Sequence, residues 1–199
     1  MKPEKTIEKL KTGEPLKFIA LGDSLTYGWM VKKGYLDFLS EMLAAKYPEG
    51  KLEVFNVGIP GDTAEGGLRR LHAHVLDMGP DIVSVQFALN DMFVGYAPEQ
   101  YEKNITAIIH RLKKEARCDI LLMTSVAIPD PHDDRQAGLY YSILIEIARQ
   151  ESLPLALVHS YWKKKIADGY RWDQLVQADQ VHPTEEGYRL MAEAIMEVF

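Results

Sequence analysis

Short apolar runs alternate along the chain with longer segments in which apolar and polar residues follow the period of a helix. Each short run is nearly all apolar and rich in branched residues, a pattern typical of parallel strands covered on both faces. These runs predict strands over residues 17–21, 52–57, 82–87, 120–126 and 155–159. No repeat, low-complexity stretch or Gly/Ser linker interrupts the alternation.

The longer segments carry helix start and stop signals. Thr63 is a suitable N-cap for one of them, and Gly79 and Pro80 end it. The last segment has Glu185 and Glu186 in its first turn, where the helix dipole favours acidic residues. The predicted helices cover residues 35–46, 64–78, 99–115, 138–151 and 185–198.

The resulting succession of five β-α units predicts a parallel sheet with right-handed crossovers and helices on both faces. The expected fold class is α/β, a three-layer α/β/α sandwich with a five-stranded parallel sheet of the flavodoxin-like type. The chain has 199 residues, of which 47% are hydrophobic. This length and composition are enough to bury one core, so a single domain over residues 1–199 is expected.

Charge and cysteine content narrow the possible partners. The formal net charge of −6 argues against a nucleic-acid or anionic-membrane surface, because both need clustered Lys and Arg. The single Cys118 excludes an internal disulfide and is expected to be a buried structural thiol. No segment approaches the roughly 18 consecutive apolar residues of a membrane-spanning helix. The first residues lack an apolar run of signal-peptide length, so a cytoplasmic location is expected.

Small or polar residues follow each of the first three predicted strands. Ser24 comes after the first strand, Gly58 after the second and Asn90 after the third. Open parallel sheets bind ligands in a crevice outside the carboxyl ends of their strands, where the strand order reverses. We therefore expect these three residues at one ligand-binding edge.

Two segments suggest nucleophilic catalysis. Gly22, Asp23 and Ser24 form a sharp polar turn, and near the C-terminus Asp179 and His182 lie three residues apart. A serine hydroxyl needs an imidazole to take its proton, and the imidazole needs an acceptor on its other nitrogen. Taken singly, each segment has an ordinary interpretation: the first as a turn or N-cap, and His182 as a capping or packing residue.

Two further positions offer hydrogen-bond donors to an oxyanion. The backbone amide of Gly58 and the side-chain amide of Asn90 are suitable donors for a tetrahedral intermediate. The alternatives are that Gly58 and Gly61 only serve a strand-to-helix turn, and that Asn90 and Asp91 form an Asx turn.

In combination these segments resemble the motifs of the SGNH, or GDSL, hydrolase family in order and spacing, across almost the whole chain. The residues that carry the resemblance are Gly22-Asp23-Ser24-Leu25, Gly58, Asn90-Asp91 and Asp179-x-x-His182-Pro183. The resemblance implies that Ser24 is the nucleophile, His182 the general base and then acid, and Asp179 the orienting carboxylate. It also implies an oxyanion hole made of the Ser24 amide, the Gly58 amide and the Asn90 side chain, with no metal or cofactor.

One residue departs from the family pattern. Ala88 stands where the family usually has a glycine two residues before Asn90. An extra methyl group at this position is expected to narrow the crevice or to shift the loop that bears Asn90.

The expected substrate is a small-molecule ester with a short acyl chain, although the family also includes enzymes for thioesters, lysophospholipids and acetylated carbohydrates. Several apolar residues on the loops of the active edge are candidates to line the site. They are Tyr27, Trp29, Met92, Phe93, Tyr96 and Ile128. The alternative for each is that it packs its loop against the sheet.

Rival functions find less support. No Gly-x-Ser-x-Gly elbow surrounds Ser24, and no phosphate-binding or dinucleotide-binding glycine motif is present. A non-catalytic ligand-binding module on the same fold remains open because of Ala88. A metal-dependent phosphoesterase would use Asp23 and the acidic cluster at residues 130–134, but that cluster is interpreted as a solvated loop. His110 and His159 have no partner pattern in the sequence.

Overall fold

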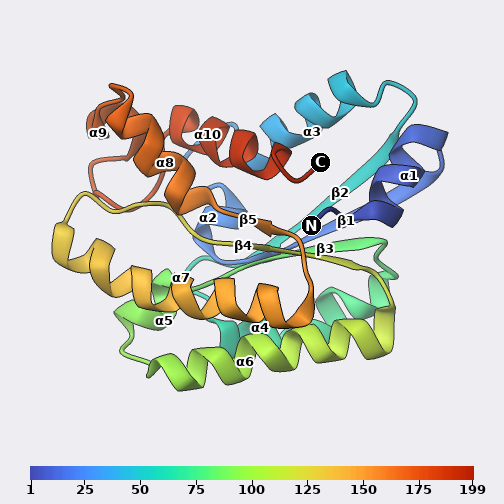
Figure 1. Cartoon of the computed structure of the whole chain (residues 1–199), viewed down its shortest axis with the longest axis horizontal. Helices are drawn as coiled ribbons and strands as arrows, with labels where there is room; N and C mark the ends of the chain where they lie inside the picture. Colours follow the sequence, from blue (N-terminus) through green and yellow to red (C-terminus); the bar gives the residue numbers. More distant parts are fainter.

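Five parallel strands form one sheet in the order β2-β1-β3-β4-β5 in the computed structural model, which describes residues 1–199 (Figure 1). This order is that of flavodoxin-like folds and confirms the predicted fold class. The strands are β1 (Pro15–Gly22), β2 (Lys51–Gly58), β3 (Ile82–Gln86), β4 (Asp119–Met123) and β5 (Leu155–Ala156). The strand order reverses between β1 and β3, so a ligand crevice is expected at the carboxyl ends of these two strands.

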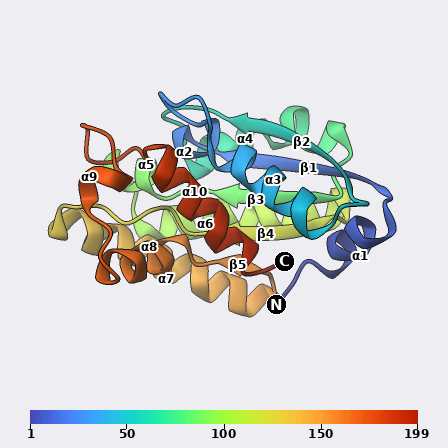
Figure 2. The same cartoon turned by 90° about the horizontal axis from the view of Figure 1, so that it is seen from above.

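Helices cover both faces of the sheet (Figure 1). On one face are α3 (Tyr35–Lys46), α8 (Val158–Ala167) and α10 (Glu185–Met196). Figure 2 shows α10 lying between α3 and α8, and it contacts both. On the other face are α4 (Ala64–His74), α6 (Pro98–Arg111) and α7 (Pro131–Glu151). Short helices lie at the carboxyl ends of the strands: α2 (Ser24–Tyr27), α5 (Leu89–Phe93) and α9 (Trp172–Leu175).

The core follows from this layering. A single cluster of 52 buried hydrophobic residues fills both interfaces between sheet and helices. The central strand β3 is buried at all five positions, whereas the edge strand β2 is at most half-buried. The burial pattern therefore agrees with parallel strands covered on both faces, apart from the edge.

The ends of two strands differ from the sequence prediction. β4 ends at Met123 rather than at residue 126, and β5 contains two residues rather than five. The reason is a side-chain contact: Thr124 Oγ1 accepts the amide of His159 at 3.0 Å, within the first turn of α8. The chain has therefore already entered the helix at residues that were predicted to continue the strand.

The start of α7 was also predicted wrongly. The helix begins at Pro131 rather than at residue 138. Asp130 is its N-cap, and its side chain accepts the amides of His132 and Asp133. Proline is favoured at the first helical position because its missing N–H has no partner there in any case. The segment with Pro131 is therefore a helix start and not a solvated loop.

An N-terminal helix, α1 (Glu4–Thr12), was not predicted. It is fixed near the amino ends of the strands, far from the carboxyl edge (Figure 1). The amide and hydroxyl of Thr6 both donate to Asp119, and Lys9 forms an ion pair with Asp81. Two short 3-10 and π-helical turns, Leu76–Met78 and Leu112–Ala116, extend α4 and α6.

Cys118 lies at the start of β4's segment of the chain, just before Asp119. Cys118 is half-buried rather than fully buried, and burial raises the pKa of its thiol to about 12. The thiolate is thus strongly disfavoured, as expected for an unreactive cysteine.

None of the helices combines the length and apolar character that crossing a bilayer requires.

Candidate active site

Ser24 stands at the first position of α2, directly after β1. The Asp23 carboxylate accepts the amide of Leu25 at 2.9 Å, which fixes the sharp turn out of the strand. Ser24 is only 6% exposed, and its own amide has no acceptor within the protein. The local fold thus presents a serine hydroxyl together with a free N–H, at the end of β1.

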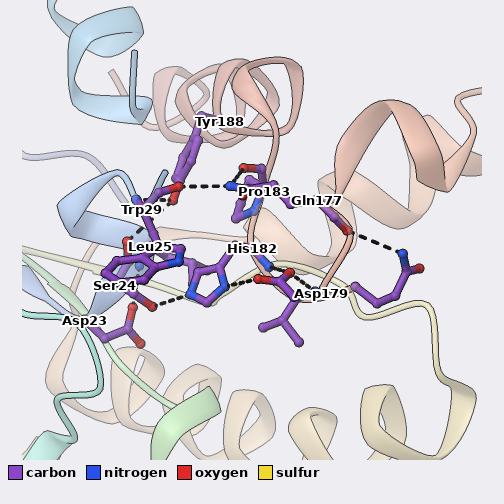
Figure 3. A network of polar contacts seen from close by, with 11 residues as sticks. Asp23, Ser24, Leu25, Trp29, Gln177, Asp179, His182, Pro183 and Tyr188 are labelled. Atoms are coloured by element: carbon purple, nitrogen blue, oxygen red, sulfur yellow. Dashed lines mark hydrogen bonds and ion pairs between the residues drawn. The ribbon is translucent and has the colours of Figure 1, made fainter. Parts of the chain in front are cut away.

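The loop before α10 brings an imidazole and a carboxylate to this serine (Figure 3). His182 Nε2 lies 2.8 Å from Ser24 Oγ, and His182 Nδ1 lies 2.7 Å from Asp179 Oδ2. The other carboxylate oxygen, Oδ1, accepts the amides of Val181 and His182. Because Asp179 and His182 are three residues apart, a single turn holds the carboxylate next to the imidazole.

Hydrogen bonds also set the charge of Asp179. Partial burial acts to raise its pKa, but the amides of Val181 and His182 and the His182 ring outweigh burial and hold the pKa below its ordinary value. Asp179 is consequently ionised at neutral pH and able to orient a neighbouring imidazole.

Trp29, on the loop that follows Ser24, contacts both α10 and the loop that bears His182 (Figure 3). The amide of Trp29 donates to the Tyr188 hydroxyl at 3.1 Å, and its carbonyl accepts Gln177 Nε2 at 2.9 Å. Gln177 Nε2 also donates to the carbonyl of Pro183 at 2.8 Å, next to His182. The indole of Trp29 packs 5.8 Å from the imidazole, centroid to centroid. Sequence reasoning did not identify Gln177, which has no motif around it.

The Gly58 amide, an expected oxyanion donor, is already engaged. It donates to Asn56 Oδ1 at 2.9 Å, and Asn56 Nδ2 in turn donates to the carbonyl of Thr26 at 2.8 Å. A Cβ atom at Gly58 would come within 2.4 Å of the backbone nitrogen of Tyr27. Glycine is therefore required here because β2 packs closely against α2, and a role in the oxyanion hole would need the bond to Asn56 to break.

Gly61 has the properties that Gly58 lacks. Its amide has no acceptor within the protein, and its φ of +78° favours glycine. No atom lies within 4 Å of where its Cβ would be, so the backbone is open on that side. Sequence reasoning treated Gly61 only as a turn residue. Its place immediately before Asp62 and the Thr63 N-cap was the available signal.

Asn90 and Asp91 hold the loop that contains Gly61. Asn90 Nδ2 donates to the carbonyl of Asp62 at 2.8 Å, which leaves its second N–H free. Both oxygens of the buried Asp91 accept the amide of Ala64, the first residue of α4. Burial raises the pKa of Asp91 to about 7.

Ala88, the departure from the family pattern, adopts φ 152° and ψ −46° and is fully buried. Residues with a Cβ rarely adopt such a φ, which explains why glycine is usual at this position. The alanine is accommodated with a strained backbone at the N-terminus of α5. It stands two residues before Asn90, whose contact with Asp62 is nevertheless formed.

A buried network of polar side chains surrounds Asp23, the residue before Ser24. Gln86 Nε2 lies 3.2 Å from Asp23 Oδ2 and 2.8 Å from Ser125 Oγ, while Thr26 Oγ1 donates to Gln86 Oε1. Burial raises the pKa of Asp23 to about 7, against the lowering effect of the Leu25 amide and Gln86. The network fixes the β1 turn through side chains at the ends of β3 and β4.

The acidic cluster at residues 130–134 forms the N-cap and first turn of α7. Asp134 accepts His159 Nε2 and Lys163 Nζ, both at 2.8 Å, so His159 has a partner although no sequence pattern marks the pair. His110 likewise has a partner, because it lies 3.1 Å from Glu151. No group of three or more His, Cys, Asp or Glu side chains is arranged to hold a metal ion.

The expected pocket residues divide into three groups. Tyr27, Trp29 and Phe93 are exposed, with Tyr27 at 55%. Met92 and Tyr96 are half-buried; Met92 packs against the core, and the Tyr96 hydroxyl donates to Glu65 Oε2 at 2.9 Å. Ile128 is 4% exposed and belongs to the core, so for this residue the alternative of packing its loop against the sheet holds. Other exposed apolar side chains on the loops after β1, β2 and β3 are Met30, Ile59 and Val94.

The chain is similar in sequence to a known protein family and to several named enzymes. The model of the GDSL-like lipase/acylhydrolase family matches residues 20–190. An arylesterase from Vibrio mimicus is 26% identical over 184 residues, which cover 90% of this chain and 86% of that protein. Thioesterase 1/protease 1/lysophospholipase L1 from Escherichia coli K12 is 27% identical over 175 residues, covering 88% and 79%.

Solved structures show the same fold. The crystal structure of an acetylxylan esterase from Geobacillus stearothermophilus superposes with a TM-score of 0.83 at 24% identity. The match covers 94% of this chain and 95% of that one. The family match spans most of the chain, from β1 into α10. The chain therefore belongs to the GDSL-like lipase/acylhydrolase family.

Proposed function

We propose that the protein is a serine ester hydrolase in which Ser24, His182 and Asp179 act as the catalytic triad. The observation that carries this proposal is the continuous set of hydrogen bonds from Ser24 Oγ through both ring nitrogens of His182 to Asp179, with distances of 2.8 and 2.7 Å. Such an arrangement activates a serine hydroxyl and orients its base.

The reaction proceeds by two acyl transfers. Ser24 Oγ attacks the ester carbonyl carbon while its proton passes to His182 Nε2. The C–O bond to the alcohol breaks as His182 returns that proton to the leaving oxygen. Water, deprotonated by His182, then attacks the acyl-enzyme; the acid leaves and Ser24 recovers its proton. Asp179 stays ionised throughout and stabilises the imidazolium.

The oxyanion of each tetrahedral intermediate needs preorganised donors. We assign this role to the Ser24 amide, the free N–H of the Asn90 side chain and the Gly61 amide. Gly61 takes the place first expected for Gly58, because the Gly58 amide donates to Asn56 and the Gly61 amide has no acceptor.

Small esters with short acyl chains are the proposed substrates. The exposed side chains of Tyr27, Trp29 and Phe93 offer apolar surface on the segments that follow β1 and β3. The related proteins include an acetylxylan esterase, which supports activity on acetyl groups, and an arylesterase, which supports activity on aryl esters.

The test is hydrolysis of aryl esters of increasing acyl length by the wild type and by Ser24→Ala. Acetyl and butyryl esters should be hydrolysed in preference to long-chain esters, and Ser24→Ala should reduce turnover to background while leaving the fold intact. The control is Ser142→Ala, at an exposed serine on α7, which should behave as wild type. Turnover by Ser24→Ala at the wild-type rate would remove Ser24 from the mechanism.

A further inference from the structure

Arg70 lies on α4 and its side chain is only 11% exposed. Each of its three guanidinium nitrogens makes a hydrogen bond. Nε donates to Asp62 Oδ2 at 2.7 Å, Nη1 to the carbonyl of Val57 at 2.6 Å, and Nη2 to the carbonyl of Gly22 at 3.0 Å. One buried cation thus joins the ends of β1 and β2 to the side chain of Asp62.

Each acceptor is close to a residue of the proposed reaction. Gly22 ends β1 two residues before Ser24, and its carbonyl also accepts the amide of Ile59. Val57 lies at the end of β2, where the loop that carries Gly61 begins. The guanidinium therefore sets the distance between the nucleophile turn and this loop.

The third acceptor connects Arg70 to Asn90. The carbonyl of Asp62 accepts Asn90 Nδ2 at 2.8 Å, while its side chain binds Arg70 through Oδ2 and the Thr63 amide through Oδ1. Asp62 is itself only 12% exposed on its side chain. A displacement of Asp62 would move both the adjacent Gly61 amide and the Asn90 side chain.

We propose that Arg70 is a positioning residue that holds together the three groups of the oxyanion hole, on the premise of the proposed function. It touches no reacting atom, and it acts through the backbone at Gly22 and Val57 and through Asp62. A guanidinium suits this task because its planar fork presents donors in fixed directions, whereas a lysine ammonium offers one point charge.

This role predicts a particular kinetic signature. Donors in an oxyanion hole stabilise charge that develops only in the transition state, so their displacement lowers kcat and leaves ground-state binding largely unchanged. Small displacements of positioned groups cost about 10²-fold in rate, and the loss of one donor costs about 10²- to 10³-fold. Because the loop is also held by Asp91, partial displacement is expected when Arg70 is replaced.

The experiment compares kinetics of aryl acetate hydrolysis for the wild type, Arg70→Met, Arg70→Lys and Arg69→Met, with Ser24→Ala in parallel. Arg69 is the matched control, because it is the preceding residue of the same helix but its side chain is 75% exposed and bonds only to Glu65. Far-UV circular dichroism establishes the folded fraction of each variant. A boronic acid, which forms a tetrahedral adduct with the serine, reports on the oxyanion hole through its Ki.

Arg70→Met should lower kcat by about 10- to 100-fold with KM changed by less than about threefold. Its boronic acid Ki should rise by about the factor by which kcat/KM falls. Arg70→Lys should lower kcat by about 3- to 10-fold, because it keeps the charge but not the fork. Arg69→Met should match the wild type in all three quantities.

The inference is overturned if folded Arg70→Met turns over as fast as the wild type, or if its loss of kcat is matched by the unfolded fraction. Should Arg70→Met fail to fold, wild-type kcat in Arg70→Lys overturns it equally. Undiminished turnover by Ser24→Ala would instead overturn the proposed function. Activity that depends on Ser24 but is indifferent to Arg70 overturns this inference alone.

Discussion

The backbone amide of Gly58 donates a 2.9 Å hydrogen bond to the side-chain oxygen of Asn56, two residues earlier in β2. The same Asn56 side chain donates to the carbonyl of Thr26, so it ties the end of β2 to the helix that starts with Ser24. A buried or engaged N–H is not available to a substrate without first losing its partner. The bond therefore separates two glycines that the sequence presents as equivalent, Gly58 and Gly61.

A structure of the enzyme with a phosphonate bound to Ser24 distinguishes these two glycines. The phosphonyl oxygen occupies the position of the oxyanion, where donors should lie about 2.7–3.1 Å away. We expect the amides of Ser24 and Gly61 and the Nδ2 atom of Asn90 at such distances, with the Gly58 amide still on Asn56. A phosphonyl oxygen within this range of the Gly58 nitrogen would restore Gly58 as the donor.

Ala88→Gly should stabilise the protein. Residues held at unfavourable φ cost of order 1–3 kcal/mol, and glycine adopts φ 152° without a Cβ clash. Loss of one buried methyl group offsets about 0.8 kcal/mol of that gain. The free energy of unfolding measured in urea should thus rise by about 1 kcal/mol.

The matched control for Ala88→Gly is Ala137→Gly, at a buried alanine inside α7 with ordinary helical geometry. Glycine in a helix interior costs about 1 kcal/mol relative to alanine, so this variant should be less stable than the wild type. Opposite signs for the two substitutions are expected. A similar fall in stability for both would show that Ala88 carries no strain.

Asp91→Asn should change how stability depends on pH. Burial raises the pKa of Asp91 to about 7 from 3.8, so between these values the folded protein binds more protons than the unfolded chain. This contribution to stability is full below pH 3.8 and is lost as pH rises through about 7. Asparagine keeps an acceptor for the Ala64 amide but does not titrate.

The measurement is the free energy of unfolding of the wild type and Asp91→Asn at pH 5 and pH 8. Relative to the wild type, the variant should gain about 3 kcal/mol between these two pH values. Asp168→Asn, at an exposed aspartate after α8, should show no such gain. A pH-independent difference between wild type and Asp91→Asn would mean that Asp91 is ionised throughout this range.

Asp179→Asn should reduce kcat by about 10³- to 10⁴-fold with little effect on stability. The asparagine oxygen can still accept the amides of Val181 and His182, but its NH2 group faces His182 Nδ1 and favours the tautomer with the proton on Nε2. That proton prevents Nε2 from accepting the proton of Ser24. The control is Asp173→Asn, at an exposed aspartate paired with Arg171, which should keep wild-type kcat. Comparable activity of the two variants would contradict the role of Asp179.

Much of the fold was predictable because parallel strands buried on both faces leave an apolar pattern that is hard to mistake. The five strands and the bounds of α3 are examples. The start of α7 was not predictable in the same way, because Pro131 is compatible with both a loop and a first helical turn. The short β5 depends on the contact between Thr124 and His159, which are far apart in sequence.

Some residues of the site could also be predicted from the sequence, and others could not. Asp179 and His182 were predictable as a pair because one turn holds both, and the family resemblance implied that they act together with Ser24. The choice between Gly58 and Gly61 was not, since it depends on which amide finds a partner after folding. Arg70 had no motif at all, because its acceptors are backbone carbonyls and Asp62.

Labelling with a serine-directed aryl phosphonate, followed by mass spectrometry of the digested protein, tests the role of Ser24. One equivalent of phosphonate should abolish ester hydrolysis and appear on the peptide that contains Ser24, and His182→Ala should be labelled much more slowly because its serine lacks a base. Complete loss of activity with the adduct on another residue, or undiminished ester hydrolysis after full labelling of Ser24, would contradict the proposed mechanism.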